Sequence, residues 1–116
     1  MSDIRFSVVI PLFNKARTIK RSLESVFAQS LPAHEVVVVD NGSTDDSAKE
    51  VLSFQDPRIC LIQQSNQGVS AARNAGIAAA TGTHIALLDA DDTWAPEFLA
   101  TMMALIHRHP QAGWYA

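Results

Sequence analysis

The chain has 116 residues, of which 47% are hydrophobic and 18% are charged. This composition is typical of one globular domain with a sizeable core, and it excludes a disordered segment. The net charge of -3 and the scattered basic residues argue against a nucleic-acid-binding protein, which usually carries a basic face. Cys60 is the only cysteine, so the chain has no internal disulfide bond and no cysteine-based metal site.

The sequence contains no recognisable targeting or membrane-spanning segment. Its first residues lack a basic stretch followed by an apolar one, so we expect no signal peptide. No run approaches the roughly 18 apolar residues that a bilayer-spanning helix needs. We therefore expect a cytoplasmic protein and leave open whether it associates peripherally with the inner face of the membrane.

The first half of the chain predicts two strand–helix units. An apolar run over residues 6–13 predicts a strand covered on both faces, and Pro11 is expected to end its regular pairing because it has no backbone donor. Asn14 is a candidate cap for the next helix, whose apolar stripe consists of Ile19, Leu23, Val26 and Phe27. A second apolar run at 35–40 predicts a strand, and Ser43 is a candidate cap for the short helix after it.

The second half predicts two further units. Residues 59–62 are expected to form a strand, and residues 69–80 a helix that approaches the sheet through Ala72, Gly76 and Ala79. Gly82 fits the C-terminal cap of that helix. A strand over 84–88 precedes a helix with Pro96 near its first turn, and Pro110 is expected to stop that helix. Residues 111–116 predict the start of a fifth strand. The alternation predicts an α/β fold with a parallel, doubly wound sheet.

Three carboxylates follow the last complete strand: Asp89, Asp91 and Asp92. Like charges this close repel one another unless they are protonated, solvated or neutralised by a cation. A hard divalent ion such as Mg²⁺ or Mn²⁺ prefers oxygen ligands and often shares them with a diphosphate. The alternative is a solvated acidic loop, and for Asp92 we favour a helix cap over an outer position in a cation site.

The candidate functional residues all follow predicted strands, in the segments 11–14, 40–45 and 89–92. The carboxyl ends of parallel strands meet at one edge of a sheet, where open α/β sheets bind ligands. Arg73, near the start of the third helix, is placed to join them. The basic residues between Lys15 and Arg21 are interpreted as the solvated face of a helix.

These residues resemble the N-terminal, nucleotide-binding half of family-2 glycosyltransferases. The resemblance lies in VIPLFN (9–14), VVDNGSTD (38–45), NQGVSAARNAG (66–76) and LLDADD (87–92), which occur in the family's order and spacing. It implies a GT-A fold, that is, a Rossmann-like parallel sheet of four to five strands with helices on both faces. It also implies an inverting transfer from a nucleotide diphosphate-sugar, in particular a UDP-sugar, to a glycan, lipid or protein acceptor.

The resemblance also assigns roles to individual residues. Asp40 matches the acid that hydrogen-bonds the base, and Pro11 and Asn14 match the base and ribose pocket, with Gly42 and Ser43 in the same motif. The alternatives are a helix-capping acid for Asp40 and a plain strand terminator for Pro11. Asn41 stands where many relatives have a second Asp.

The other assigned residues concern the diphosphate. Arg73 matches a basic residue beside it, with a surface salt bridge as the alternative. Asp91 matches a ligand of Mn²⁺ or Mg²⁺, and Asp89 faces the ribose or a metal-bound water.

The resemblance places the general base in a C-terminal half that residues 1–116 do not include. We therefore expect this chain to be a nucleotide-sugar-binding domain that transfers sugar poorly or not at all alone. Apolar surface normally covered by that half would then favour self-association as a homo-oligomer.

Two alternatives use the same residues differently. The run from Asp89 to Thr93 fits the pattern of haloacid-dehalogenase-type phosphotransferases, in which the first Asp is a nucleophile. In those proteins the pattern follows the first strand, whereas here three strand–helix units precede it. The second alternative is a non-catalytic nucleotide-binding or interaction module.

Overall fold

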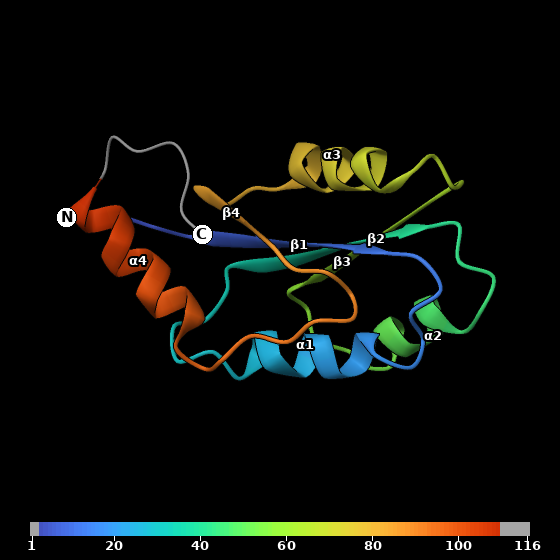
Figure 1. Ribbon diagram of the computed structural model, residues 1–116, viewed down its shortest axis with the longest axis horizontal. Helices are drawn as coiled ribbons and strands as arrows, with labels where there is room; N and C mark the ends of the chain where they lie inside the picture. The colour runs from blue at the N-terminus through green and yellow to red at the C-terminus, as the bar shows by residue number, and fades with distance from the viewer. Residues whose placement is uncertain (1–2, 110–116) are drawn as a thin grey trace.

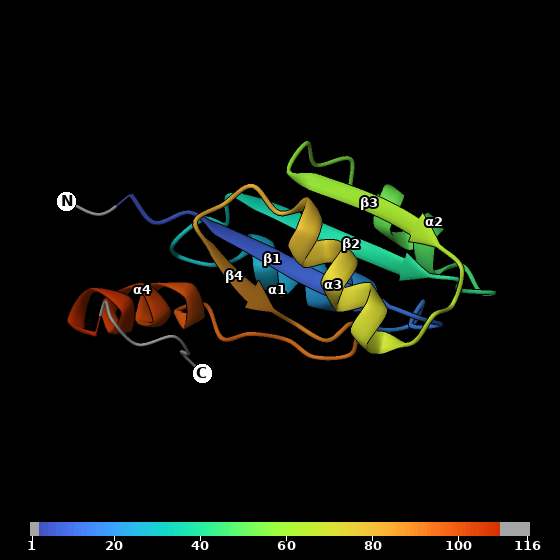
Figure 2. The same cartoon turned by 90° about the horizontal axis from the view of Figure 1, so that it is seen from above.

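The computed structural model describes residues 3–109. Its elements alternate along the chain (Figure 1), and they are β1 (Phe6–Leu12), α1 (Ile19–Phe27), β2 (Glu35–Asn41), α2 (Ser47–Leu52), β3 (Ile59–Gln64), α3 (Val69–Ala79), β4 (His84–Leu87) and α4 (Phe98–Arg108). All four strands are parallel and lie in the order β3-β2-β1-β4 (Figure 2). The predicted α/β class is confirmed. The predicted helix stop at Pro110 and the fifth strand over 111–116 lie outside the described residues.

Helices cover both faces of the sheet, as Figure 1 shows for α3 on one side and α1 and α2 on the other. Successive side chains of a strand point to opposite faces. Thus Val8 and Ile10 of β1 pack in the larger core with α1 and α4, while Val9 packs in a smaller core beneath α3. The expected apolar stripe of α1 is buried at Ile19, Leu23 and Val26.

Helix α3 lies close to the sheet because small residues face it. Ala72 and Gly76 are buried, and a Cβ atom at Gly76 would lie 2.4 Å from Cγ1 of Val9. This confirms two of the three predicted contact positions. The third, Ala79, is exposed, and Ala75 packs against the smaller core in its place.

Strand β1 continues through Pro11 to Leu12, so the prediction that Pro11 ends pairing is wrong for the β2 side, where Pro11 pairs with Val39. The carbonyl of Val9 accepts from the backbone N–H of Leu88 at 3.1 Å. The alternation of the strand therefore turns the missing N–H of Pro11 toward β4. The β1–β4 register ends at Val9, and β4 stops before β1 does (Figure 2). The chain after β4 is thereby free to leave the sheet.

The turn between α3 and β4 is anchored to the opposite, amino end of the sheet. Gly82 N donates to Ser7 Oγ at 2.8 Å, Ser7 Oγ donates to Glu35 Oε2 at 2.6 Å, and Thr81 N donates to the same carboxylate oxygen. A Cβ atom on Gly82 would lie 2.5 Å from the carbonyl oxygen of Arg5. Gly82 is therefore required for close approach. It does not cap α3, whose C-cap is Ala80.

Helix α4 begins at Phe98 with Glu97 at its N-cap. The prediction that Asp92 caps this helix is therefore wrong, and Pro96 precedes the first turn. Residues between β4 and α4 run along α1 and are tied to it, because Ser22 Oγ donates to the carbonyl oxygen of Ala90 at 3.0 Å. Within residues 3–109, no helix is long and apolar enough to cross a bilayer.

Candidate functional site

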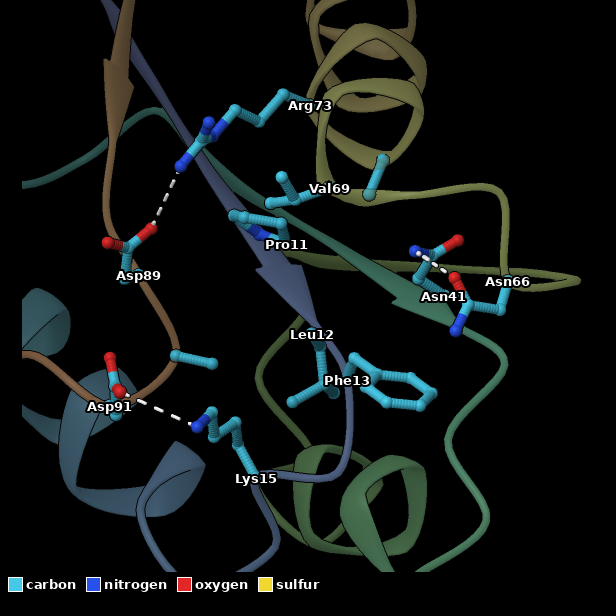
Figure 3. Close-up of a pocket in the computed structure, with 12 residues that line it drawn as sticks. Pro11, Leu12, Phe13, Lys15, Asn41, Asn66, Val69, Arg73, Asp89 and Asp91 are labelled. Atoms are coloured by element: carbon cyan, nitrogen blue, oxygen red, sulfur yellow. Dashed lines mark hydrogen bonds and ion pairs between the residues drawn. The ribbon is translucent and has the colours of Figure 1, made fainter.

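A pocket of about 420 Å³ opens at the carboxyl edge of the sheet, between α3 and the segment after β4 (Figure 3). Its lining comes from the end of β1 and the loop after it, the end of β2, the first turns of α3 and the acidic segment. Pro11 and Phe13 lie on its apolar side, and charged side chains lie on the β4 side. The predicted meeting of strand ends is therefore found.

The acidic segment presents three carboxylates together. Oxygen atoms of Asp89, Asp91 and Asp92 lie within 4.8 Å of one another, and all three residues are exposed. A turn brings them close, with Asp92 N donating to the carbonyl oxygen of Asp89 at 3.0 Å. The carbonyl of Ala90 is held from the other side by Thr18 Oγ1 at 2.9 Å. This set of oxygen donors fits a hard divalent cation such as Mg²⁺ or Mn²⁺.

Two basic side chains reach this segment from opposite sides of the pocket (Figure 3). Arg73 Nη2 lies 3.4 Å from Asp89 Oδ1, and Lys15 Nζ lies 3.6 Å from Asp91 Oδ2. Lys15 was not among the predicted site residues, because the predicted helix extended back over it. Helix α1 starts only at Ile19, so Lys15 lies in the turn after β1. Its place directly after the first strand was the signal that could have identified it.

Asn14 was predicted to cap the helix after β1. It instead connects two loops, and the N-cap of α1 is Thr18. Asn14 adopts a left-handed conformation with φ of 51°, and its Oδ1 accepts from the backbone N–H of Thr44 at 2.8 Å. Its own N–H donates to Ser43 Oγ at 3.0 Å. Ser43 is therefore a partner of Asn14 and no cap either, since α2 starts at Ser47 with Asp46 as N-cap. Both polar residues stabilise the loops behind the pocket.

Asp45 strengthens the same loop pair. Its carboxylate accepts from Ala16 N at 3.1 Å and from the backbone N–H of Ser47 at 2.9 Å. The hydroxyl of Ser47 also donates to it, and this bond holds the pKa of Asp45 below its ordinary value. The carboxylate is therefore ionised at neutral pH, where it fixes the start of the turn that carries Lys15.

Asp40 lies at the end of β2, level with Leu12 of β1 and 4% exposed. Its side chain is on the α2 face of the sheet by the alternation of the strand, and Oδ1 accepts from Ser43 N at 3.0 Å. It does not belong to the pocket lining. Gly42, with φ of 82°, turns the chain here, and a Cβ atom on it would lie 2.8 Å from Asn66 N.

Asn41 is the residue of β2 that lines the pocket, and it was not among the predicted site residues. Its side-chain amide donates to Gly68 O at 3.1 Å and to Asn66 Oδ1 at 3.3 Å. Its Oδ1 accepts from Gln64 Nε2 at 3.1 Å and Gln67 N at 3.2 Å. Strand alternation alone, which turns neighbouring residues to opposite faces, could have shown that Asp40 and Asn41 do not share a pocket.

The eight residues expected at the site therefore divide into two groups. Four line the pocket, namely Pro11, Arg73, Asp89 and Asp91. Four form the loops behind it, namely Asn14, Asp40, Gly42 and Ser43. All of them lie at the carboxyl edge of the sheet, but Asp40 lies outside the pocket that Asp89 and Asp91 line.

The comparisons with known proteins agree with this architecture. The sequence model of the family "Glycosyl transferase family 2" matches residues 7–115, and the chain belongs to this family. The succinoglycan biosynthesis protein ExoO of Rhizobium meliloti is 46% identical over 102 residues, which are 87% of this chain and 29% of that protein. Family membership favours the glycosyltransferase interpretation over the phosphotransferase alternative.

Solved structures confirm the GT-A fold. Residues 1–349 of Staphylococcus aureus TarS, in complex with UDP-GlcNAc, match with a TM-score of 0.85 and 31% identity over 92% of this chain and 32% of that one. The mannosyltransferase PcManGT from Pyrobaculum calidifontis, in complex with GDP-Man and Mn²⁺, matches with a TM-score of 0.83 and 30% identity, covering 90% and 33% of the two chains. The chain spans between 14% and 42% of the length of the curated relatives it matches, and 29% of ExoO.

Proposed function

We propose that this chain binds a nucleotide diphosphate-sugar with a divalent cation and forms the donor-binding part of a glycosyltransferase. The observation that carries the proposal is the meeting of Asp89, Asp91 and Arg73 around one pocket at the carboxyl edge of the sheet. Carboxylates suit the cation and a guanidinium suits the diphosphate. Structural neighbours that hold UDP-GlcNAc or GDP-Man support a nucleotide-sugar donor.

Asp40 lies outside the pocket lining, so we propose that the base extends past the end of β2 to reach it and that its carboxylate accepts the imide N–H, with uracil as the preferred base. Only Oδ1 of its carboxylate has a hydrogen-bond partner among residues 3–109, namely Ser43 N. Within the same residues, every buried side-chain oxygen has a hydrogen-bond partner. Because Oδ2 has none, it is not buried and is accessible to solvent. That oxygen is available to a ligand donor, while Asn14 and Ser43 keep the loop around it in place.

Asp91 and Asp89 are proposed to hold the cation, Mg²⁺ or Mn²⁺. The bound cation would neutralise the negative charge that develops on the leaving nucleoside diphosphate. Arg73 is proposed to bind a phosphate oxygen, for which its guanidinium offers paired donors. Pro11 contributes apolar surface at the end of β1, where its missing N–H leaves no unpaired donor in the pocket.

Transfer also needs an acceptor site and a general base that takes the proton of the acceptor hydroxyl. We propose that both lie outside these 116 residues, which is consistent with the chain spanning less than half the length of its relatives. The acceptor is a glycan, lipid or protein, and the name of ExoO supports polysaccharide biosynthesis. On this proposal the isolated chain binds donor but transfers sugar poorly or not at all, in the cytoplasm or at the inner face of the membrane.

Calorimetric titration with UDP-, GDP- and dTDP-sugars, each with and without Mn²⁺, tests the proposal. We expect a UDP-sugar to bind best, and only weakly without the metal. Asp91→Ala should weaken the metal-dependent binding at least about tenfold, which corresponds to about 1.4 kcal/mol. Asp46→Ala is the matched control, because Asp46 is exposed at the start of α2 and outside the pocket. Acceptor-dependent turnover by the 116-residue chain, or equal binding by Asp91→Ala, would contradict the proposal.

A further inference from the structure

Lys15 is a charged residue of the pocket to which neither the family resemblance nor the proposed function gives a role. It extends from the turn after β1 toward the acidic segment, opposite Arg73 (Figure 3). Its Nζ lies 3.6 Å from Asp91 Oδ2, and the two side chains are 45% and 51% exposed. The lysine therefore stands beside one of the two carboxylates proposed to hold the cation.

The backbone of Lys15 is fixed while its ammonium group is not. Its N–H donates to Ser47 Oγ at 2.9 Å, and its carbonyl accepts from Thr18 N at 3.1 Å and Ile19 N at 2.9 Å. Within residues 3–109, Asp91 is the single acidic partner of the ammonium group. A lysine side chain carries a compact charge on a flexible four-carbon stem, so the ammonium group can change partners while the backbone of the turn stays in place.

We propose that Lys15 is an exchangeable counter-ion of the site. It neutralises Asp91 when no divalent cation is bound, and it turns to a phosphate oxygen of the nucleotide when the cation takes Asp91. This inference rests on the proposed function of the pocket, and it adds a diphosphate-binding residue that competes with the metal for one carboxylate.

The charges around the pocket favour this exchange. Three carboxylates face two basic groups, Lys15 and Arg73. A divalent cation at Asp91 would place two positive charges beside the ammonium group, and these like charges repel one another. A nucleotide diphosphate adds negative charge in the same space. Because an exposed ion pair contributes little free energy, leaving Asp91 costs the lysine little.

A permanent surface salt bridge is the competing explanation, and it differs in its consequence for the nucleotide. Under that explanation Lys15 never contacts phosphate, so its removal leaves the binding of UDP at saturating Mn²⁺ unchanged. Under exchange, its removal acts in opposite directions on the two ligands. Metal binding becomes tighter because a competitor for Asp91 is gone, and nucleotide binding becomes weaker because a phosphate partner is gone.

The experiment compares wild type with Lys15→Met, Lys15→Arg and Lys20→Met. Methionine keeps the apolar length of the side chain and removes its charge. Lys20 is exposed on α1 and outside the pocket, so Lys20→Met controls for the change in net charge. The probes are MnCl₂ alone, followed by the electron paramagnetic resonance of free Mn²⁺, and UDP in saturating MnCl₂, followed by calorimetry. Circular dichroism checks that each variant is folded.

We expect Lys15→Met to bind Mn²⁺ alone roughly two- to fivefold more tightly, which is the range that an exposed ion pair supports. At saturating Mn²⁺, UDP should bind it roughly fivefold or more weakly, since a charge-assisted contact is lost. Lys15→Arg should retain UDP binding, and Lys20→Met should match wild type in both titrations. Unchanged UDP affinity, or weaker Mn²⁺ binding, in Lys15→Met overturns the exchange.

The same titrations separate this inference from the proposed function. If wild type binds Mn²⁺ and UDP while Lys15→Met behaves like Lys20→Met, the role of Lys15 is overturned and the proposed function stands. If wild type binds neither ligand, both are overturned. If wild type binds Mn²⁺ but no nucleotide, the proposed function fails and phosphate exchange by Lys15 fails with it.

Discussion

The side-chain amide of Asn41, at the edge of the pocket, forms hydrogen bonds through both its nitrogen and its oxygen. The nitrogen donates to Gly68 O and Asn66 Oδ1, and the oxygen accepts from Gln64 and Gln67. The residue is 4% exposed, so water cannot readily replace a lost partner. A carboxylate at this position could accept the two bonds to its oxygen but could not donate to Gly68 or Asn66.

Asn41→Asp should therefore destabilise the protein at neutral pH. Two donors would be lost and a charge would face two oxygen atoms, and a buried group without its partner costs about 1–3 kcal/mol. Urea unfolding followed by circular dichroism at pH 7 measures the loss. Asn74→Asp, at an exposed position of α3, is the control and should change stability little. A variant as stable as wild type would show that this amide does not hold the loop before α3.

The predicted site residues that line the pocket are those placed by the order of the strands and helices. Asp89, Asp91 and Arg73 line the pocket because their positions follow from the order of strands and helices. Lys15 and Asn41 depend on local detail, namely where α1 starts and which way the last residue of β2 points. The pattern of residue types in the loop after β1 does not determine where α1 starts, whereas alternation along β2 does indicate which way Asn41 points.

The same limit applies to whole elements. The strands and helices were predictable because their apolar residues repeat with the period of a strand or a helix. The helix caps were not predictable in the same way. Asn14, Ser43 and Gly82 form contacts between loops and strands that are distant in sequence. The side chains that cap helices are also those that bond to loop backbone, so a local pattern does not distinguish the two uses.

Glu35 shows how one element is held by another across the sheet. Its carboxylate accepts from the hydroxyl of Ser7 on β1 and from the N–H of Thr81 in the turn before β4. Burial alone would raise the pKa of Glu35, but the hydrogen bonds from Ser7 and Thr81 outweigh it and hold the pKa below its ordinary value. The ionised form is therefore the one that the folded protein favours.

Glu35→Gln should lower stability at neutral pH and have less effect in acid. A folded-state pKa below the unfolded value of 4.5 means that the carboxylate contributes its full stabilisation above that value. The contribution disappears as the pH falls through the lower, folded pKa. Urea unfolding at pH 7 and at about pH 3 should therefore show a difference from wild type that shrinks in acid.

Glu24→Gln, at an exposed position of α1, is the control for this measurement. Removing its charge should change stability equally little at both pH values. A difference between Glu35→Gln and wild type that stays constant across the acid range would rule out the ionised carboxylate as its source.

At the scale of the whole molecule, the sheet is covered unevenly. Helix α3 packs over β1 and β2 (Figure 2), and within residues 3–109 β4 pairs with β1 alone. On the α3 face of β4, Ile85 is 39% and Leu87 47% exposed, and Ile77 of α3 is 44% exposed. Ile77 lies one turn along α3 from Arg73, whose guanidinium reaches the end of β4. Apolar side chains therefore adjoin an open strand edge, which proteins usually cover or interrupt with charge.

We expect the isolated chain to self-associate through this face, a second copy covering Ile85 and Leu87. Light scattering over a concentration series should show the average mass rising with concentration. The double variant Ile85→Lys, Leu87→Lys should remain monomeric, with a stability within about 0.5 kcal/mol of wild type, as is usual for exposed positions. Leu52→Lys is the control, because Leu52, at 63%, is the most exposed large apolar residue within residues 3–109 but lies on α2, away from β4. A wild-type chain that stays monomeric at high concentration would contradict the prediction. Equal dissociation by Leu52→Lys would show that general apolar exposure, and not the β4 face, drives the association.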